Sequence, residues 1–138
     1  MSAPVAPSPG KYLVREMDSA AREFYRRLSE DGQLATTHCE HCQTATFPPR
    51  PRCPRCGREQ GWRELPRAGR LHAFTTQESA LRFGAPLVLA LAELGAVVVP
   101  GIVEAPYGQL RVGHPIEVQL RPEPETGLTL LRFIPQPP

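Results

Sequence analysis

Four cysteines in two pairs are the residues of this chain whose types and spacing predict a definite chemistry. The pairs are Cys39-Glu40-His41-Cys42 and Cys53-Pro54-Arg55-Cys56, each with two residues between its thiols. That spacing lets both thiolates of a pair turn toward one cation, and two facing pairs complete a tetrahedron. The pattern therefore predicts a metal site with four ligands, Cys39, Cys42, Cys53 and Cys56. Gly57 supplies the permissive backbone that such a turn needs.

The ligand set favours zinc in a structural role. Structural zinc sites are enclosed by four protein ligands, whereas catalytic sites keep a position open for water or substrate. A rubredoxin-type iron site uses the same four thiolates, so iron remains an alternative. A dithiol redox enzyme would not need the second pair. His38 and His41 flank the first pair, and we expect them to face solvent or to lie behind the ligands.

The rest of the sequence lacks a pattern that signals catalysis. His72 and His114 have no neighbouring serine, cysteine or carboxylate pattern of the kind that marks a nucleophile with its base. The serines lie in the tail, the helical region or a loop, outside any nucleophile-elbow motif. We therefore expect no catalytic activity from the chain alone.

A tail, a helix and the cysteine region are expected in the first half of the chain. Residues 1–16 predict a flexible tail without the apolar run of a secretory signal. Within residues 17–32, Ala20, Phe24 and Leu28 recur every four residues and predict a helix that begins at Asp18 or Ser19 and ends near Gly32. Residues 33–66 are rich in Arg and Pro and poor in core formers, so a metal must hold them together as a zinc ribbon. Between the two pairs, Gln43 to Arg52 predict a short hairpin with a proline-rich tip.

Residues 67–138 predict strands only. Five runs rich in Val, Leu, Ile, Phe and Thr indicate a small barrel, of which the OB-fold is the common five-stranded kind. The runs are Arg70–Gln77, Leu87–Leu94, Ala96–Glu104, Pro115–Arg121 and Leu128–Ile134. The fold class is thus mainly β, with an N-terminal helix, a rubredoxin-like zinc ribbon and a five-stranded OB-fold barrel.

The second and third runs of the barrel are apolar at nearly every position, which predicts burial on both faces. One face fills the barrel, so the other needs a cover: the N-terminal helix, the ribbon or a second protein. Pro86, Glu93 and Pro100 interrupt this apolar stretch, so it does not predict a membrane span. We expect a cytoplasmic protein, where paired cysteines are metal ligands more often than disulfides.

Positive charge is concentrated in the ribbon. Residues 50–70 hold seven arginines and two glutamates, whereas residues 70–138 hold five arginines and six glutamates. A nucleic-acid-binding barrel needs a basic groove and exposed aromatic rings, so this distribution argues against that role. Three arginines near the second cysteine pair are candidate contacts for the phosphates of a coenzyme or for a partner, because guanidinium groups pair with phosphate oxygens. They are Arg50, Arg52 and Arg55; the alternative is that they only solvate a proline-rich loop.

The order of these motifs resembles one known family. The motifs are Phe24-Tyr25, Cys39-x-x-Cys42, Phe47-Pro48-Pro49-Arg50, Cys53-x-x-Cys56-Gly57, the run from Gly69 to Thr75, and the run from Arg111 to Val118. Over about residues 20–134 the chain is similar to proteins with a rubredoxin-like zinc ribbon and an acyl-CoA-associated OB-fold, catalogued as domain of unknown function thirty-five. The resemblance matches Cys39, Cys42, Cys53 and Cys56 to the metal ligands of that family and transfers no catalytic residue.

The resemblance implies an accessory role in an acyl-CoA-processing complex of lipid or polyketide metabolism. Members of that family are partners of thiolase-fold enzymes: thiolases, aldolases and ketosynthase-like acyltransferases. The implied role is to bind such an enzyme and to assist the binding of its acyl-CoA thioester. A nucleic-acid-binding zinc-ribbon/OB module and an autonomous acyl-CoA enzyme are the alternatives. Whether copies of the chain associate with one another stays open.

Overall fold

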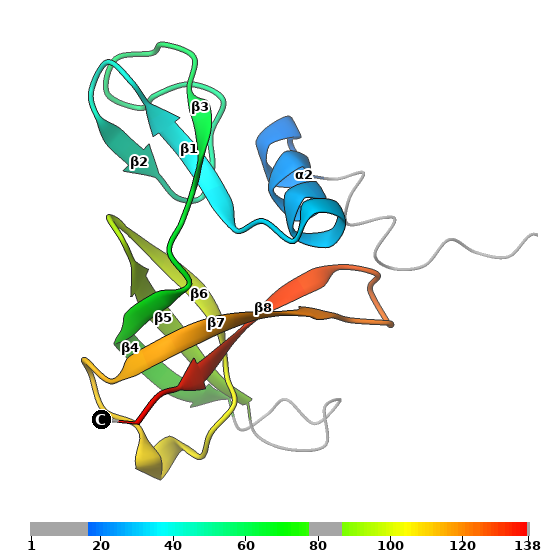
Figure 1. Cartoon of the computed structure of the whole chain (residues 1–138), viewed down its shortest axis with the longest axis vertical. Helices are drawn as coiled ribbons and strands as arrows, with labels where there is room; N and C mark the ends of the chain where they lie inside the picture. The colour runs from blue at the N-terminus through cyan, green and yellow to red at the C-terminus, as the bar shows by residue number, and fades with distance from the viewer. Residues whose placement is uncertain (1–16, 78–86, 138) are drawn as a thin grey trace, which may run out of the picture.

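A computed structural model describes residues 17–77 and 87–137 of the chain. The predicted tail, residues 1–16, lies outside the described residues. A helix and a small three-stranded sheet lie side by side at one end of the molecule, and a barrel forms the other end (Figure 1). The mainly β fold class with one short N-terminal helix is therefore confirmed. No helix in the described ranges is long and apolar enough to cross a membrane.

Helix α2, Ser19–Arg26, forms where the apolar spacing predicts it. The side chain of Asp18 caps its start by accepting a hydrogen bond from the Ala21 N–H at 2.8 Å, which satisfies one of the free donors at a helix N-terminus. The chain continues through a π-helical turn, η1, Arg27–Asp31, and leaves it at Gly32, whose φ of 60° lies in the left-handed region.

The inner side of the helical segment packs on both neighbouring parts of the molecule. Ala20, Phe24 and Leu28 are buried as their spacing predicts. Phe24 and Leu28 share one hydrophobic cluster with residues of the barrel, and the ring of Phe24 also meets that of Phe47 edge-on at 5.6 Å. The segment therefore connects the ribbon to the barrel.

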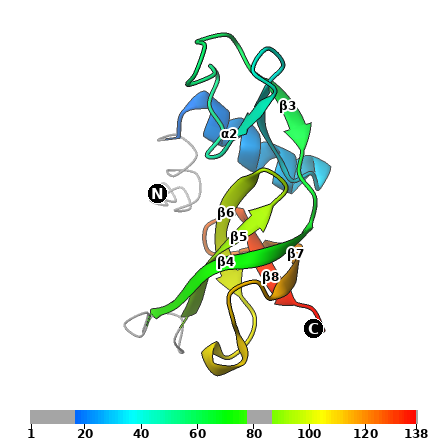
Figure 2. The ribbon, with the colours of Figure 1, turned by 90° about the vertical axis from the view of Figure 1, so that its left-hand side faces the viewer.

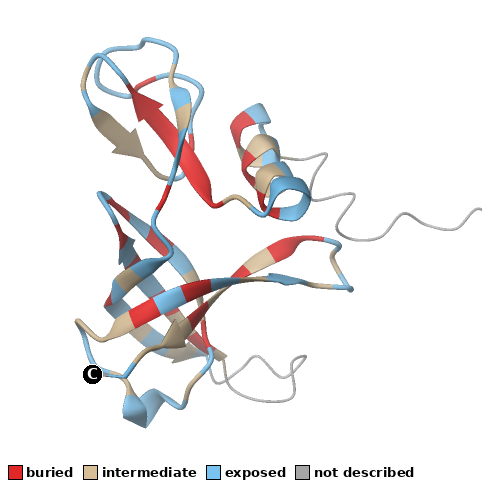
Figure 3. Cartoon of the chain, viewed as in Figure 1, coloured by how far each residue is buried: buried red, intermediate tan, exposed pale blue. Residues whose placement is uncertain are grey.

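The ribbon is a sheet with β1, Ala35–Cys39, between β2, Thr44–Thr46, and β3, Gly61–Glu64. Both pairings are antiparallel. All five residues of β1 are buried, as Figure 3 shows in red. The buried hydroxyls are satisfied: Thr36 donates to the Thr46 carbonyl, and Thr37 accepts from the Arg50 N–H at 3.0 Å.

The hairpin predicted between the cysteine pairs is wrong in its position. The chain reverses within the first pair instead, so that β1 and β2 flank residues 40–43. The proline-rich segment after β2 forms bends and an isolated bridge between Arg52 and Glu59, and it contacts the sheet where the Arg50 N–H donates to Thr37. The physical reason is that Pro48, Pro49 and Pro51 carry no N–H for a strand ladder, while the cysteine turn already reverses the chain.

The barrel contains five strands close to the predicted runs. They are β4, Ala68–Gln77; β5, Leu87–Leu94; β6, Val97–Val103; β7, Pro115–Pro122; and β8, Thr129–Pro135. Their order around the closed barrel is β4-β5-β6-β8-β7, with β7 paired to β4. All pairs are antiparallel except β6 with β8. A five-stranded Greek-key barrel with this strand order is the OB-fold topology, and a short turn of 3-10 helix, η3, Tyr107–Gln109, lies between β6 and β7.

The barrel core contains Phe133, Leu71, Val99, Ile116 and Val118, all almost completely buried. Two glycines permit close approach within its wall. A Cβ on Gly69 would lie 2.1 Å from the Glu93 carbonyl oxygen, and one on Gly101 would lie 2.6 Å from the ring of Phe133. Larger residues at these positions would force strands or the ring apart.

Only one face of the apolar strands is buried. In β5, Val88, Ala90, Ala92 and Leu94 are buried, but Leu91 between them is 40% exposed. Figure 2 shows β4, β5 and β6 facing the viewer, with α2 and the ribbon above them rather than in front. The helix and the ribbon, two of the three predicted covers, therefore do not cover this face.

Candidate metal centre

The structure brings the four cysteines together at one end of the ribbon. Their sulfur atoms all lie within 4.8 Å of one another. Two of these distances join the two turns: Cys39 Sγ lies 3.6 Å from Cys56 Sγ, and Cys42 Sγ lies 4.0 Å from Cys53 Sγ. Four thiolates about 2.3 Å from a central zinc would lie roughly 3.8 Å apart, so the observed spacing fits a tetrahedral ion.

The two cysteine turns have similar backbones, each with an N–H that donates to a cysteine sulfur. In the first turn the Cys42 N–H donates to the Cys39 sulfur, and in the second the Arg55 N–H donates to the Cys53 sulfur, both at 3.4 Å. The residue after each turn has a positive φ: 54° at Gln43 and 77° at Gly57. Gly57 adopts this conformation freely, as predicted, whereas Gln43 does so at some cost. Each turn thus directs two sulfurs and a backbone donor toward the same point.

The pKa values of Cys42 and Cys53 are shifted in opposite directions. Backbone N–H groups of Cys56 and Arg55 lower the pKa of Cys53 to about 7, because they stabilise its thiolate. Desolvation, followed by hydrogen bonds with the thiols of Cys56 and Cys53, raises the pKa of Cys42 to about 12. Four neighbouring thiolates repel one another, so full deprotonation requires a cation among them. The donor set therefore fits a thiophilic divalent metal.

Burial leaves little access to the sulfur atoms. Cys39 and Cys53 are buried, Cys42 is half-buried, and only Cys56 is exposed. With four thiolates as ligands, a tetrahedral ion has no position left for water or substrate. The chemistry that the site supports is cross-linking of the two turns, which holds the ribbon in place.

The histidines beside the first pair differ from each other. His41 is exposed, as expected, and neither histidine belongs to the group of potential ligands. His38 is buried, with Nε2 3.2 Å from Arg63 Nη1. Arginine only donates, so Nε2 accepts; Nδ1 lies 3.4 Å from Glu40 Oε1 and makes no hydrogen bond within the described part of the chain. Of the two places expected for His38, a position facing solvent is excluded, because β1 is the central strand of the ribbon sheet.

The three candidate arginines, Arg50, Arg52 and Arg55, are all exposed around the second cysteine turn. Arg52 Nη1 donates to the Gly57 carbonyl at 3.1 Å, which keeps this side chain near the turn. Arg50 and Arg52 also line a groove of about 630 Å³ together with three prolines and Asp18. The structure thus places two of the three arginines on one groove and leaves Arg55 outside it.

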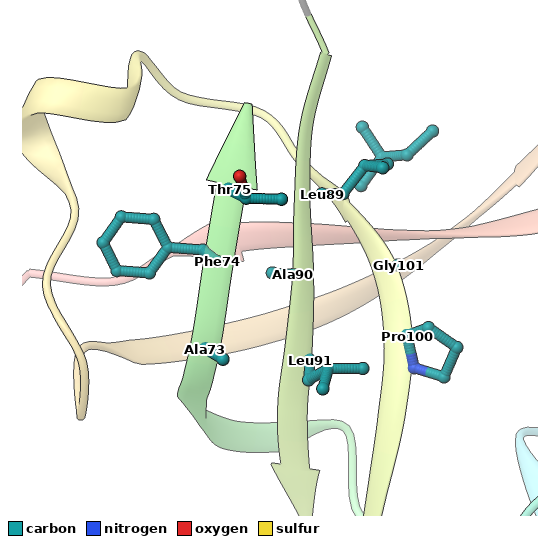
Figure 4. A pocket seen from close by; sticks show the side chains of 9 residues that line it. Ala73, Phe74, Thr75, Leu89, Ala90, Leu91, Pro100 and Gly101 are labelled. Atoms are coloured by element: carbon teal, nitrogen blue, oxygen red, sulfur yellow. The ribbon is translucent and has the colours of Figure 1, made fainter. Parts of the chain in front are cut away.

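A second feature, on the barrel, was missed as a site by sequence reasoning. The outward face of β4, β5 and β6 forms a groove of about 480 Å³ whose lining is almost entirely apolar. Figure 4 shows Leu91 of β5 beside Pro100 of β6, with Leu89 further along β5. The two-sided apolar pattern of these strands was the available signal, since it predicted a face in need of a cover.

Comparisons with known proteins agree with this architecture. Residues 30–60 match the model of the ChsH2 rubredoxin-like zinc ribbon domain. A DUF35 domain-containing scaffold protein of Methanocaldococcus jannaschii is 29% identical over 124 residues, which cover 85% of this chain and 86% of that protein.

Two solved structures share the fold. One, an Ltp2-ChsH2(DUF35) aldolase, superposes with a TM-score of 0.76 at 23% identity and covers 87% of this chain and 97% of its own. The other, a DUF35 protein of unknown function from Sulfolobus solfataricus, has a TM-score of 0.66 at 17% identity and covers 91% and 92%. The ribbon match, the relative and both structures agree with the resemblance to the DUF35 family that the sequence predicted.

Proposed function

We propose that this chain is a non-catalytic accessory subunit that binds a thiolase-fold enzyme and assists the binding of its acyl-CoA thioester. The observation that carries the proposal is the closed four-thiolate centre, which organises a structure but offers no position for a reacting group. The names of two similar proteins agree with it, since one is called a scaffold protein and the other forms part of an aldolase. We propose zinc as the metal.

The contacts of His72 and His114 support a non-catalytic role. His72 Nδ1 lies 3.0 Å from Glu93 Oε1 on the barrel surface, and both side chains are about half exposed. His114 Nε2 donates to the Gln136 carbonyl at 2.9 Å. In the described part of the chain these two rings thus contact a carboxylate and a carbonyl, rather than a hydroxyl or thiol that they could activate.

The barrel surface favours protein docking over nucleic-acid binding. An OB-fold binds oligonucleotides on the face of its second and third strands, which are β5 and β6 here. That face needs basic side chains and stacking rings for single strands. In this chain its groove is lined by residues such as Leu89, Leu91, Pro100 and Ile102. Among the described residues that line this groove none is basic, which argues against the alternative of a nucleic-acid-binding module.

The arginines of the ribbon support a contact with coenzyme A. Acyl-CoA carries a diphosphate and a 3′-phosphate, and exposed guanidinium groups bind such oxygens with paired hydrogen bonds. Arg50 and Arg52 line one groove beside the metal centre. We propose that the metal holds these side chains where the phosphates of a thioester bound to the partner enzyme can reach them.

Co-expression with a thiolase-fold protein of the same organism, sought first among the products of neighbouring genes, tests the proposed function. The two chains should co-purify through an affinity tag on this chain and elute as one complex from a size-exclusion column. Binding of that complex to an acyl-CoA should be tighter than binding to the enzyme subunit alone. Elution as two separate proteins, together with salt-sensitive binding of this chain to oligonucleotides, would refute the proposal and favour the nucleic-acid alternative.

A further inference from the structure

The outward face of β4, β5 and β6 carries two rows of mostly apolar side chains. The strand registers place Ala73, Leu91 and Pro100 in one row, and Thr75, Leu89 and Ile102 in the next. An antiparallel sheet that faces water normally alternates apolar residues inside with polar residues outside. Here both sides of β5 and β6 are apolar, so the outward side has a composition that suits burial.

This face is uncovered in the described parts of the chain. All nine residues that line the groove belong to β4, β5 and β6, and none belongs to α2 or to the ribbon. Leu91 and Val98, on neighbouring strands of this face, are 40% and 38% exposed. Contiguous apolar surface of this kind marks an interaction site in a water-soluble protein.

The charges beside the rows are already paired within the chain. Glu93 lies two residues beyond Leu91 on β5, and its carboxylate contacts His72 at 3.0 Å. Glu104 lies two residues beyond Ile102, and its carboxylate contacts Arg121 at 3.0 Å. Among the described residues, no charged side chain lines the groove between them. A surface that complements it is therefore uncharged and apolar.

The size of the groove indicates a larger partner rather than a second copy. A stable interface buries about 800 Å² per partner, which corresponds to roughly 20–30 residues a side. Nine residues line this groove. Two copies that met only through this face would fall well short of that area. A larger protein can insert one apolar segment here and gain the remaining contacts elsewhere.

We infer that the outward groove of β4, β5 and β6 is the docking surface for an uncharged, apolar segment of the thiolase-fold enzyme. This inference rests on the proposed function and names the surface of this chain that performs it. The metal centre at the other end of the molecule then holds the ribbon, while the barrel wall makes the contact.

Two substitutions test whether this groove, rather than another part of the chain, binds the enzyme. Leu91→Glu places a carboxylate in the groove at a position exposed enough for the barrel to fold. Val112→Glu is the control, because Val112 is an apolar residue that is 68% exposed and lies outside the groove. Circular dichroism and metal content should show that both variants fold. Affinity for the purified thiolase-fold subunit is then measured by isothermal titration calorimetry.

Leu91→Glu should weaken binding at least tenfold, because docking would bury an unpaired charge, whereas Val112→Glu should bind within about twofold of the unmodified chain. A photo-crosslinking residue at position 91 should label the enzyme subunit. If the unmodified chain binds the subunit and Leu91→Glu binds equally well, the groove assignment is wrong and the proposed function stands. Crosslinking between two copies of this chain would also overturn the groove assignment. If the unmodified chain does not bind, the proposed function itself fails.

Discussion

Gly101 of β6 faces the ring of Phe133, and its replacement by alanine tests how closely the barrel wall is packed. The new methyl carbon would lie 2.6 Å from Cζ and 2.7 Å from Cε2 of that ring. Carbon atoms at rest are about 3.5–4.0 Å apart, so the methyl group is roughly 1 Å too close. Phe133 has no exposed surface, so its ring cannot turn outward into solvent to make room.

The expected cost of Gly101→Ala is about 1–3 kcal/mol in the free energy of unfolding, the usual range for an extra methyl group in a packed core. Urea unfolding followed by circular dichroism measures it. Gly108→Ala is the matched control, because a Cβ at Gly108 meets no atom within 4 Å, and this variant should be as stable as the unmodified chain. Equal stability of Gly101→Ala and Gly108→Ala would refute the close approach of Gly101 to Phe133.

Three further predictions concern the metal centre, the helix and the coenzyme. Cys53→Ser should abolish metal binding and unfold the ribbon, because a structural zinc site contributes on the order of 10 kcal/mol to folding. Metal analysis and the amide NMR signals of the ribbon measure these two effects. Full metal content in the variant would contradict the prediction. The pKa of Glu23 is lowered to about 2, chiefly by its hydrogen bond from Arg26, so the stability that this carboxylate adds is present above about pH 4.5 and lost as the pH falls toward 2. A carboxyl NMR titration with a midpoint near 4.5 would show that the pair does not form. Replacement of Arg50, Arg52 and Arg55 by glutamine should raise the KM of the complex for acyl-CoA roughly tenfold, since exposed ion pairs contribute about 0.2–1 kcal/mol each. The KM for acyl-dephospho-CoA, which lacks the 3′-phosphate, should rise less.

Local patterns in the sequence predicted most of the elements. The spacing of Ala20, Phe24 and Leu28 and the cap at Asp18 located the helix, because one buried stripe and one side-chain hydrogen bond decide where such a short helix begins. Apolar runs bounded by Gly or Pro located the five barrel strands. The two cysteine turns were equally clear, since their spacing is a requirement of the metal geometry.

The ribbon strands were harder to predict, because long-range contacts decide them. Nothing local marks β1 as completely buried, since Thr36, Thr37 and His38 are polar. They are buried because β2 and β3 pair on either side of β1 and supply partners for their polar groups. The prolines between the cysteine pairs were interpreted as a hairpin tip, but the first turn had already reversed the chain.

Closure of the barrel also cannot be predicted from local sequence patterns. The parallel contact of β6 with β8, at Val103 and Phe133, joins segments thirty positions apart. The need for Gly69 and Gly101 becomes visible only when the neighbouring strand or ring is in place. The same holds for the apolar groove, because the sequence predicted that β5 and β6 need a cover but not which face stays open.

Reconstitution with the thiolase-fold subunit tests the accessory role most directly. The measurement is kcat/KM for acyl-CoA of that subunit alone, of this chain alone, and of the two combined in equal amounts. An accessory subunit predicts at least a tenfold increase for the pair over the enzyme alone and no turnover by this chain. An unchanged kcat/KM on addition of this chain, or turnover of acyl-CoA by this chain alone, would contradict it.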